Sequence, residues 1–129
     1  MKSDLKKSKY DLEFRTKKFS NSIIGLCKLI EKNSITKPLI SQIIRSATSV
    51  GANYTEANNA CSKKDFRNKI YICKKEICET KYWLLLLKEN KLTSLEDDIN
   101  LIHMEANELT LIFGKIISSL KNNSKLKNS

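Results

Sequence analysis

Apolar residues recur at alternating steps of three and four in four separate segments of this chain. The series run through residues 12–30, 40–61, 66–87 and 99–120. A three-four step keeps one stripe of a helix turned toward the same partner, so each segment predicts one amphipathic helix. Within 129 residues, the simplest way to bury four such stripes is against one another. The sequence therefore predicts an all-α protein whose four helices share one core.

Short connections between these segments predict the topology. Only three Gly and one Pro occur in the chain, which suits helices and argues against a sandwich or barrel. Because helices joined by short loops pack as antiparallel neighbours, we expect an up-down-up-down four-helix bundle. Residues 1–9 are expected to form a flexible basic N-terminus and residues 122–129 a disordered polar tail. The predicted helices span residues 11–32, 38–59, 63–90 and 95–121.

Two local features refine this prediction. Ser62 followed by Asp65 resembles a capping box at the start of the third helix. Gly51 lies inside the second helix beside its apolar stripe, where a missing side chain would let a neighbouring helix come close. Glycine in a helix interior lowers stability by ~1 kcal/mol.

Neither a signal peptide nor a membrane span is recognisable. The longest uninterrupted apolar run is residues 83–87, far short of the ~20 residues that a span needs. Four cysteines show no C-x-x-C pair and no zinc spacing. We therefore expect a cytoplasmic protein with reduced, buried thiols.

The net charge of +10 is unevenly distributed. Residues 1–37 hold ten Lys or Arg and four acidic residues, and residues 62–91 hold nine and four. Residues 38–61 balance, and residues 92–129 come to minus one. A positive field favours nucleic acid or another polyanion, and the dominance of Lys over Arg predicts phosphate contacts rather than base readout. The alternative is that Lys merely solvates helix faces. The candidate nucleic-acid contacts are Arg15, Lys17, Lys18, Lys63, Lys64, Arg67, Lys74, Lys75 and Lys81.

The third helix carries more apolar surface than one stripe needs. In a four-helix bundle no helix is central, so the excess predicts a second contact surface and a homo-oligomer. Coverage by the fourth helix or the tail is the alternative. The expected oligomer contacts are Tyr82, Trp83, Leu85 and Leu86.

A polar stripe follows the second helix beside its core, at Arg45, Ser49, Asn53 and Glu56. If the chain folds back at residues 61–62, opposite charges on the second and third helices meet at matching heights. Glu56 should then lie level with Arg67, and Arg45 with Glu76 or Glu79. Such pairs would fix the register between the helices. No His lies in register with Ser49, so no catalytic arrangement is expected.

This stripe also carries a resemblance. Residues 42–57, QIIRSATSVGANYTEA, resemble the central motif of the bacterial four helix bundle protein family, also called the 23S rRNA intervening-sequence protein family. Residues 62–66, SKKDF, resemble the family's S-x-x-(D/E)-F, and residues 75–80 and 10–13 resemble two further motifs. The link at residues 58–61 departs from the family pattern, and this departure leaves the expected fold unchanged. The matching signature positions are Arg45, Ser49, Asn53, Glu56, Phe66, Glu76 and Glu79.

The resemblance implies a small four-helix protein without established enzymatic activity. Family members are often ring-like homopentamers, and some are encoded inside intervening sequences of large-subunit ribosomal RNA genes. A distant relative, the accessory protein of diversity-generating retroelements, is a basic pentameric barrel that binds a reverse transcriptase and nucleic acid. A homopentamer is accordingly the expected assembly.

No other site emerges from the sequence. His103 is the only histidine, so a di-iron bundle with two Glu-x-x-His pairs is excluded. The three glycines are scattered and form no phosphate loop. Lys63 and Lys64 open the third helix and are suited either to phosphate or to a solvated first turn. We expect no cofactor, metal, membrane or small-molecule substrate.

The sequence as a whole predicts a non-enzymatic, homo-oligomeric accessory protein that associates with RNA or DNA. The alternative is a protein–protein interaction scaffold whose lysines only keep it soluble.

Overall fold

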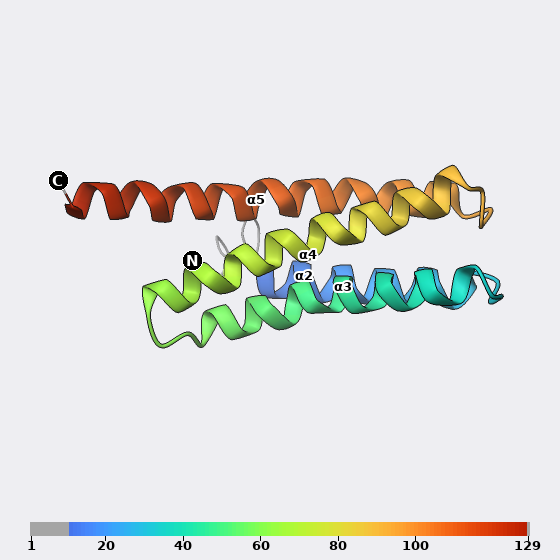
Figure 1. Cartoon of the computed structure of the whole chain (residues 1–129), viewed down its shortest axis with the longest axis horizontal. Coiled ribbons are helices and arrows are strands. Elements are labelled where there is room, and N and C mark those ends of the chain that lie inside the picture. The colour runs from blue at the N-terminus through green and yellow to red at the C-terminus, as the bar shows by residue number, and fades with distance from the viewer. Residues whose placement is uncertain (1–10, 129) are drawn as a thin grey trace.

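The computed structural model describes residues 11–128, with side chains described as far as residue 123. Within these residues, four helices form an antiparallel up-down-up-down bundle (Figure 1). Helix α3 packs against both α2 and α4, and α5 packs against α4 and, less extensively, against α2. The helices are α2 (Leu12–Leu29), α3 (Thr36–Asn58), α4 (Lys63–Glu89) and α5 (Glu96–Asn128).

Helix α5 extends beyond its predicted end. It continues through Asn128, whereas the sequence predicts an end near residue 121 and a disordered tail from residue 122. Residues 122–128 contain neither Pro nor Gly, so their composition does not interrupt the helix. Helix α2 ends three residues earlier than predicted, at Leu29. The expected flexible segment 1–9 and Ser129 lie outside the described residues.

Side-chain caps define where two of the helices begin. The Asp11 carboxylate accepts the backbone N–H of Phe14 at 3.1 Å, and the Ser62 hydroxyl accepts that of Asp65 at 3.0 Å. Each cap satisfies an N–H that has no partner inside the helix. The predicted start of the third helix is thereby confirmed.

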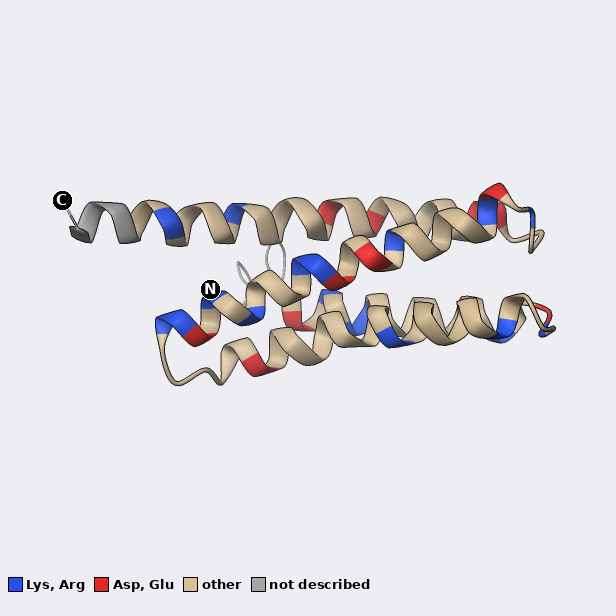
Figure 2. Ribbon diagram, viewed as in Figure 1, with Lys and Arg blue, Asp and Glu red and all other residues tan. Residues whose placement is uncertain are grey.

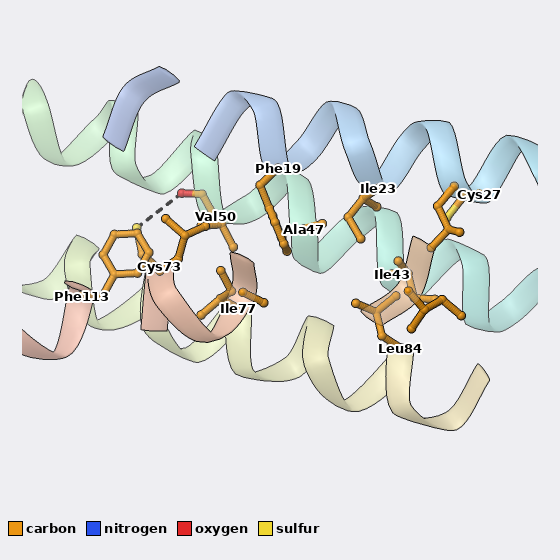
Figure 3. Close-up of a cluster of buried hydrophobic side chains, with 14 of the residues drawn as sticks. Phe19, Ile23, Cys27, Ile43, Ala47, Val50, Cys73, Ile77, Leu84 and Phe113 are labelled. Atoms are coloured by element: carbon orange, nitrogen blue, oxygen red, sulfur yellow. Dashed lines mark hydrogen bonds between the residues drawn. The ribbon is translucent and has the colours of Figure 1, made fainter. Parts of the chain in front are cut away.

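The core consists largely of the predicted apolar stripes, although Ile117 rather than Ile116 is buried in α5. Phe19, Ile43, Ile77 and Phe113 each come from a different helix and are almost completely buried (Figure 3). The second stripe is predicted to include Cys61, but this residue is exposed because α3 ends at Asn58 before the stripe reaches it. Each helix is apolar mainly on its inner side, and none within residues 11–128 has an apolar stretch long enough to cross a bilayer.

Gly51 does not mark an unusually close helix contact. A Cβ added at Gly51 would lie 3.5 Å from the Thr16 hydroxyl and 3.6 Å from the Thr16 carbonyl oxygen, which is ordinary van der Waals contact. Helix α2 does come close at Gly51, as expected, but the approach does not require glycine. There is room beside Thr16 for the methyl group of an alanine at position 51.

We predict that Gly51→Ala stabilises the protein. Alanine restricts the unfolded chain and favours the helix, so the free energy of unfolding should rise by up to about 1 kcal/mol. Urea denaturation measures the change. Gly25→Ala is the matched control, because nothing lies within 4 Å of the added Cβ there. Loss of stability in Gly51→Ala alone would show that α2 and α3 pack more tightly than this geometry indicates.

Candidate nucleic-acid interface

Ion pairs between α3 and α4 set the register of the two helices. The Arg45 guanidinium contacts the Glu76 carboxylate at 2.8 Å and also pairs with Glu79. The Glu76 side chain is only 5% exposed, whereas that of Arg45 is 46% exposed. The Trp83 indole N–H donates to Glu79 at 3.4 Å and closes the cluster. The predicted pairing of Arg45 is confirmed, and it involves both of the acids that the sequence offered as alternatives.

The partner predicted for Glu56 is wrong. Its carboxylate contacts the Lys69 ammonium at 2.8 Å instead of Arg67. Residues two apart on a helix differ by ~200° in direction, so Lys69 faces α3 when Arg67 faces α5. Arg67 accordingly lines a cavity together with Leu120 of α5.

The other polar groups of the α3–α4 seam bond to one another. The Asn53 amide donates to the carbonyl and hydroxyl oxygens of Ser49, at 2.8 and 2.9 Å. In the buried part of the seam, the Thr80 hydroxyl lies 2.8 Å from that of Ser46 and donates to the Glu76 carbonyl at 2.9 Å. These bonds satisfy groups that burial would otherwise penalise. The polar seam therefore helps to hold α3 and α4 together.

A row of cations lies on the side of α4 that faces α5. Arg67, Lys74, Lys81 and Lys88 follow one another at intervals of seven residues. Seven residues are close to two helical turns, so these side chains project in nearly the same direction at steps of ~10 Å. We call these four residues the cation row. On α4 these side chains lie between the face that packs in the core and the face that is exposed to solvent. The row therefore borders the groove between α4 and α5.

The far half of the row is tied to α5 by hydrogen bonds. The Lys88 ammonium donates to Asn100 at 2.9 Å, and the Lys81 ammonium donates to Asn107 at 3.2 Å. Burial lowers the pKa of His103, and the nearby charges of Lys81 and Lys88 lower it further. The positive charges of Lys81 and Lys88 therefore also act on a third side chain of α5, that of His103.

The near half of the row opens into a shallow depression of about 590 Å³ between α4 and α5. Two ammonium groups, several hydroxyls and an amide line it, a combination that suits phosphate oxygens. Beside it, the Lys121 ammonium lies 5.8 Å from the centre of the Tyr71 ring. The lining residues are Lys74, Thr110, Leu111, Gly114, Lys115, Ser118, Ser119 and Asn122.

A larger cavity of about 780 Å³ adjoins the α3–α4 turn, and we call it the turn cavity. One part of its wall is apolar, from Ala57, Ala60, Cys61, Phe66 and Leu120. The remainder is polar or cationic, from Ser62, Lys63, Lys64, Arg67 and Asn123. Arg67 belongs both to this cavity and to the cation row.

Charge is segregated along α4 and α5 (Figure 2). Residues 63–75 hold six Lys or Arg and one acidic residue, and residues 109–129 hold four Lys and no Asp or Glu. Helix α4 begins and α5 ends at the same end of the bundle (Figures 1 and 2), where Arg67 and Leu120 line one cavity and Lys74 and Lys115 line another. Lys115 and Lys121 are absent from the predicted contacts because the net charge of residues 92–129 is minus one. If that segment is divided after Glu108, the part that follows has an excess of positive charge.

The nine predicted cationic contacts do not form one surface. Lys63, Lys64, Arg67, Lys74 and Lys81 lie along the α4–α5 side or at the turn cavity. The remaining four lie elsewhere and are Arg15, Lys17, Lys18 and Lys75.

Arg15 is occupied within the bundle. Its guanidinium contacts Glu105 at 2.6 Å and Glu108 at 3.1 Å, and the hydrogen bond to Glu105 raises its pKa. Lys75 lies 3.7 Å from the Glu76 carboxylate. Lys17 borders the α2–α3 groove. The structure thus concentrates the cations of α4, and not those of α2, beside α5.

The predicted oligomer contacts divide into exposed and half-buried residues. Tyr82 is 55% exposed and Leu85 is 44% exposed, whereas Trp83 and Leu86 are half-buried. The Trp83 ring packs edge-on against Tyr82, with the ring centres 5.2 Å apart. On α5, Met104 and Leu111 are also exposed, a feature absent from the sequence prediction because they lie outside the apolar stripe.

Comparisons with known proteins agree with the sequence resemblance. The profile of a family described as 23S rRNA-intervening sequence protein matches residues 9–115. The chain is also similar to a crystal structure of a protein of unknown function from the S23 ribosomal protein family of Bacteroides thetaiotaomicron. Identity is 33%, the TM-score is 0.70, and the match covers 81% of this chain and 96% of that one. No curated protein shows a significant match.

We predict that Arg45→Met destabilises the protein by about 2 kcal/mol, because the buried Glu76 carboxylate loses its cation. Urea denaturation of the variant measures the loss. Lys17→Met, at an exposed position of α2, removes one charge as a control and should change stability by less than about 0.5 kcal/mol. Equal stability of the two variants would contradict a register-setting role for Arg45.

Proposed function

The chain belongs to the family of 23S rRNA-intervening sequence proteins, and we propose that it is a non-enzymatic, homo-oligomeric accessory protein that associates with nucleic acid. Its α4–α5 face is the proposed contact surface. The observation that carries the proposal is the concentration of cations at one end of this face, where acidic residues are scarce.

The type of cation supports phosphate contact. Lysine is a compact point charge on a flexible stem, and it binds phosphate without reading bases. Lys74 and Lys115 line one depression from opposite helices, so a phosphate between them would meet both charges. Binding of this kind is electrostatic, sequence-tolerant and strongly dependent on salt.

A non-enzymatic role is supported by how the signature side chains are used. Arg45 is paired with two carboxylates, and Asn53 is bonded to Ser49. Groups that are already engaged in ion pairs and hydrogen bonds within the protein are poor candidates for contact with a substrate. The family resemblance therefore supports a shared architecture more than a shared reaction.

The homo-oligomer is supported by exposed apolar groups on α4. Tyr82 and Leu85 lie outside the monomer core, and aromatic side chains are common interface anchors. The family resemblance implies five subunits. These residues belong to the second half of α4, whereas the densest positive charge belongs to the first half, so one helix serves both contacts.

We predict that the double variant Lys74→Gln, Lys115→Gln weakens binding to RNA and DNA. The slope of log affinity against log salt should become shallower by about 0.9 for each duplex phosphate that the variant no longer neutralises. Fluorescence anisotropy across a salt series measures both quantities.

The matched control is Lys28→Gln, Lys37→Gln, which removes the same charge at exposed positions near the opposite end of the bundle. Equal weakening in both variants would mean that net charge alone attracts nucleic acid. No binding of the native protein at low salt would contradict the proposal and favour the scaffold alternative.

We predict that Leu85→Glu dissociates the oligomer, because a carboxylate in an apolar contact would lose its hydration. Light scattering at micromolar concentration should give several subunits for the native protein and a smaller mass for the variant. Leu29→Glu, at an exposed position of α2, should leave the mass unchanged. A native protein that scatters as a monomer would contradict the proposed assembly.

A further inference from the structure

We propose that the turn cavity holds one unpaired nucleobase of a single-stranded nucleic acid, whose phosphates lie on the neighbouring cations. This inference rests on the proposed function, and it adds the class of nucleic acid and the place of one base.

The apolar wall of the cavity suits a flat aromatic ring. Phe66 is half-buried and lines the cavity together with Leu120 of α5. Ala57 and Ala60 have short side chains and leave the space open. The volume of about 780 Å³ lies within the range of cavities that hold small ligands, and a base of any kind has a face that stacks on an aromatic side chain.

The cationic part of the cavity suits the phosphate attached to that base. Lys63 and Lys64 lie in the first turn of α4, where backbone N–H groups add to their positive field. Arg67 follows one turn later and begins the cation row, which leads to Lys74 and the depression between α4 and α5. A strand with a base in the cavity would therefore continue along positive charge.

Such a cavity discriminates between single and double strands. A base in a duplex is stacked and paired, and must be turned out of the helix before it can enter a pocket. That rearrangement opposes binding, whereas the bases of a single strand are already accessible. Single strands should therefore bind more tightly than duplexes of equal charge.

Cys61 lines the turn cavity and supplies a direct probe. It is exposed, as is Cys78 on the outer side of α4, whereas Cys27 and Cys73 are buried. Burial raises the pKa of Cys27 to about 11 and that of Cys73 to about 12, so these two thiols should react slowly with an alkylating reagent. The rate at which Cys61 is alkylated in the free protein serves as the reference.

The experiment measures alkylation of each cysteine by mass spectrometry in the native protein. The ligands are an oligothymidylate of about 15 nucleotides, an abasic strand of the same length and charge, and a duplex, each at saturation. An acidic peptide of similar charge is the fourth ligand. We expect the oligothymidylate to slow alkylation of Cys61 several-fold relative to the free protein, and the other three ligands to slow it much less.

Three outcomes separate the inference from the proposed function. If the intact and abasic strands both bind but protect Cys61 equally, the cavity takes no base and the inference is overturned. The inference is also overturned if the acidic peptide protects Cys61 as well as the oligothymidylate does. If no nucleic acid binds at low salt, the proposed function itself fails.

Two variants test the stacking contact. Phe66→Leu should weaken binding of the single strand by about tenfold, with little effect on the duplex, because one base loses its stacking partner. Phe14→Leu, at an exposed phenylalanine of α2, is the control. Ala60→Phe fills the cavity without removing a core contact, and it should weaken single-strand binding in the same way. Unchanged binding in Ala60→Phe would overturn the inference even if Phe66→Leu proved unstable.

Discussion

The contact between α3 and α4 determines what the rest of the bundle presents to solvent. Arg45 bridges to Glu76 and Glu79, and the Thr80 and Ser46 hydroxyls meet in the buried seam. The Glu76 carboxylate is buried and has its cation at one position along the helices. If one helix slid past the other, the carboxylate would be left unpaired in a medium of low dielectric, which is unfavourable. With α4 held in one register and rotation, the direction of every other residue of α4 is decided.

The cation row follows from that rotation. The core of α4 repeats at three-four spacing, so residues seven apart share a face whether they are apolar or charged. Once Ile77 and Leu84 point inward, Lys74, Lys81 and Lys88 border α5. The positive groove is therefore a consequence of the periodicity that builds the core.

The two proposed contacts of α4 lie on different parts of its outer surface. Exposed apolar groups at Tyr82 and Leu85 belong to the half that leads to the α4–α5 loop, and the turn cavity belongs to the opposite end. Assembly through Tyr82 and Leu85 would leave the turn cavity accessible in each subunit. A ring of subunits would then offer several equivalent sites, which raises the effective concentration of a strand after its first contact.

Periodicity alone was enough to predict the helices, their order and most of the residues that fill the core, because helical spacing and burial are both local properties of the sequence. Ser62 as a cap and Arg45 as a partner of Glu76 or Glu79 were also predictable, since each depends on spacing along a helix or on distance from one turn. Glu56 pairs with Lys69 and not with Arg67 because of how α4 is rotated about its own axis. The distance of each residue from the turn does not reveal this rotation. The pairing of Arg15 with Glu105 and the joint lining of the turn cavity by Phe66 and Leu120 bring together residues from non-adjacent parts of the chain. Sequence by itself determined which face of each helix is buried, and only the packing of the four helices decided which charges meet a partner within the bundle and which face its grooves.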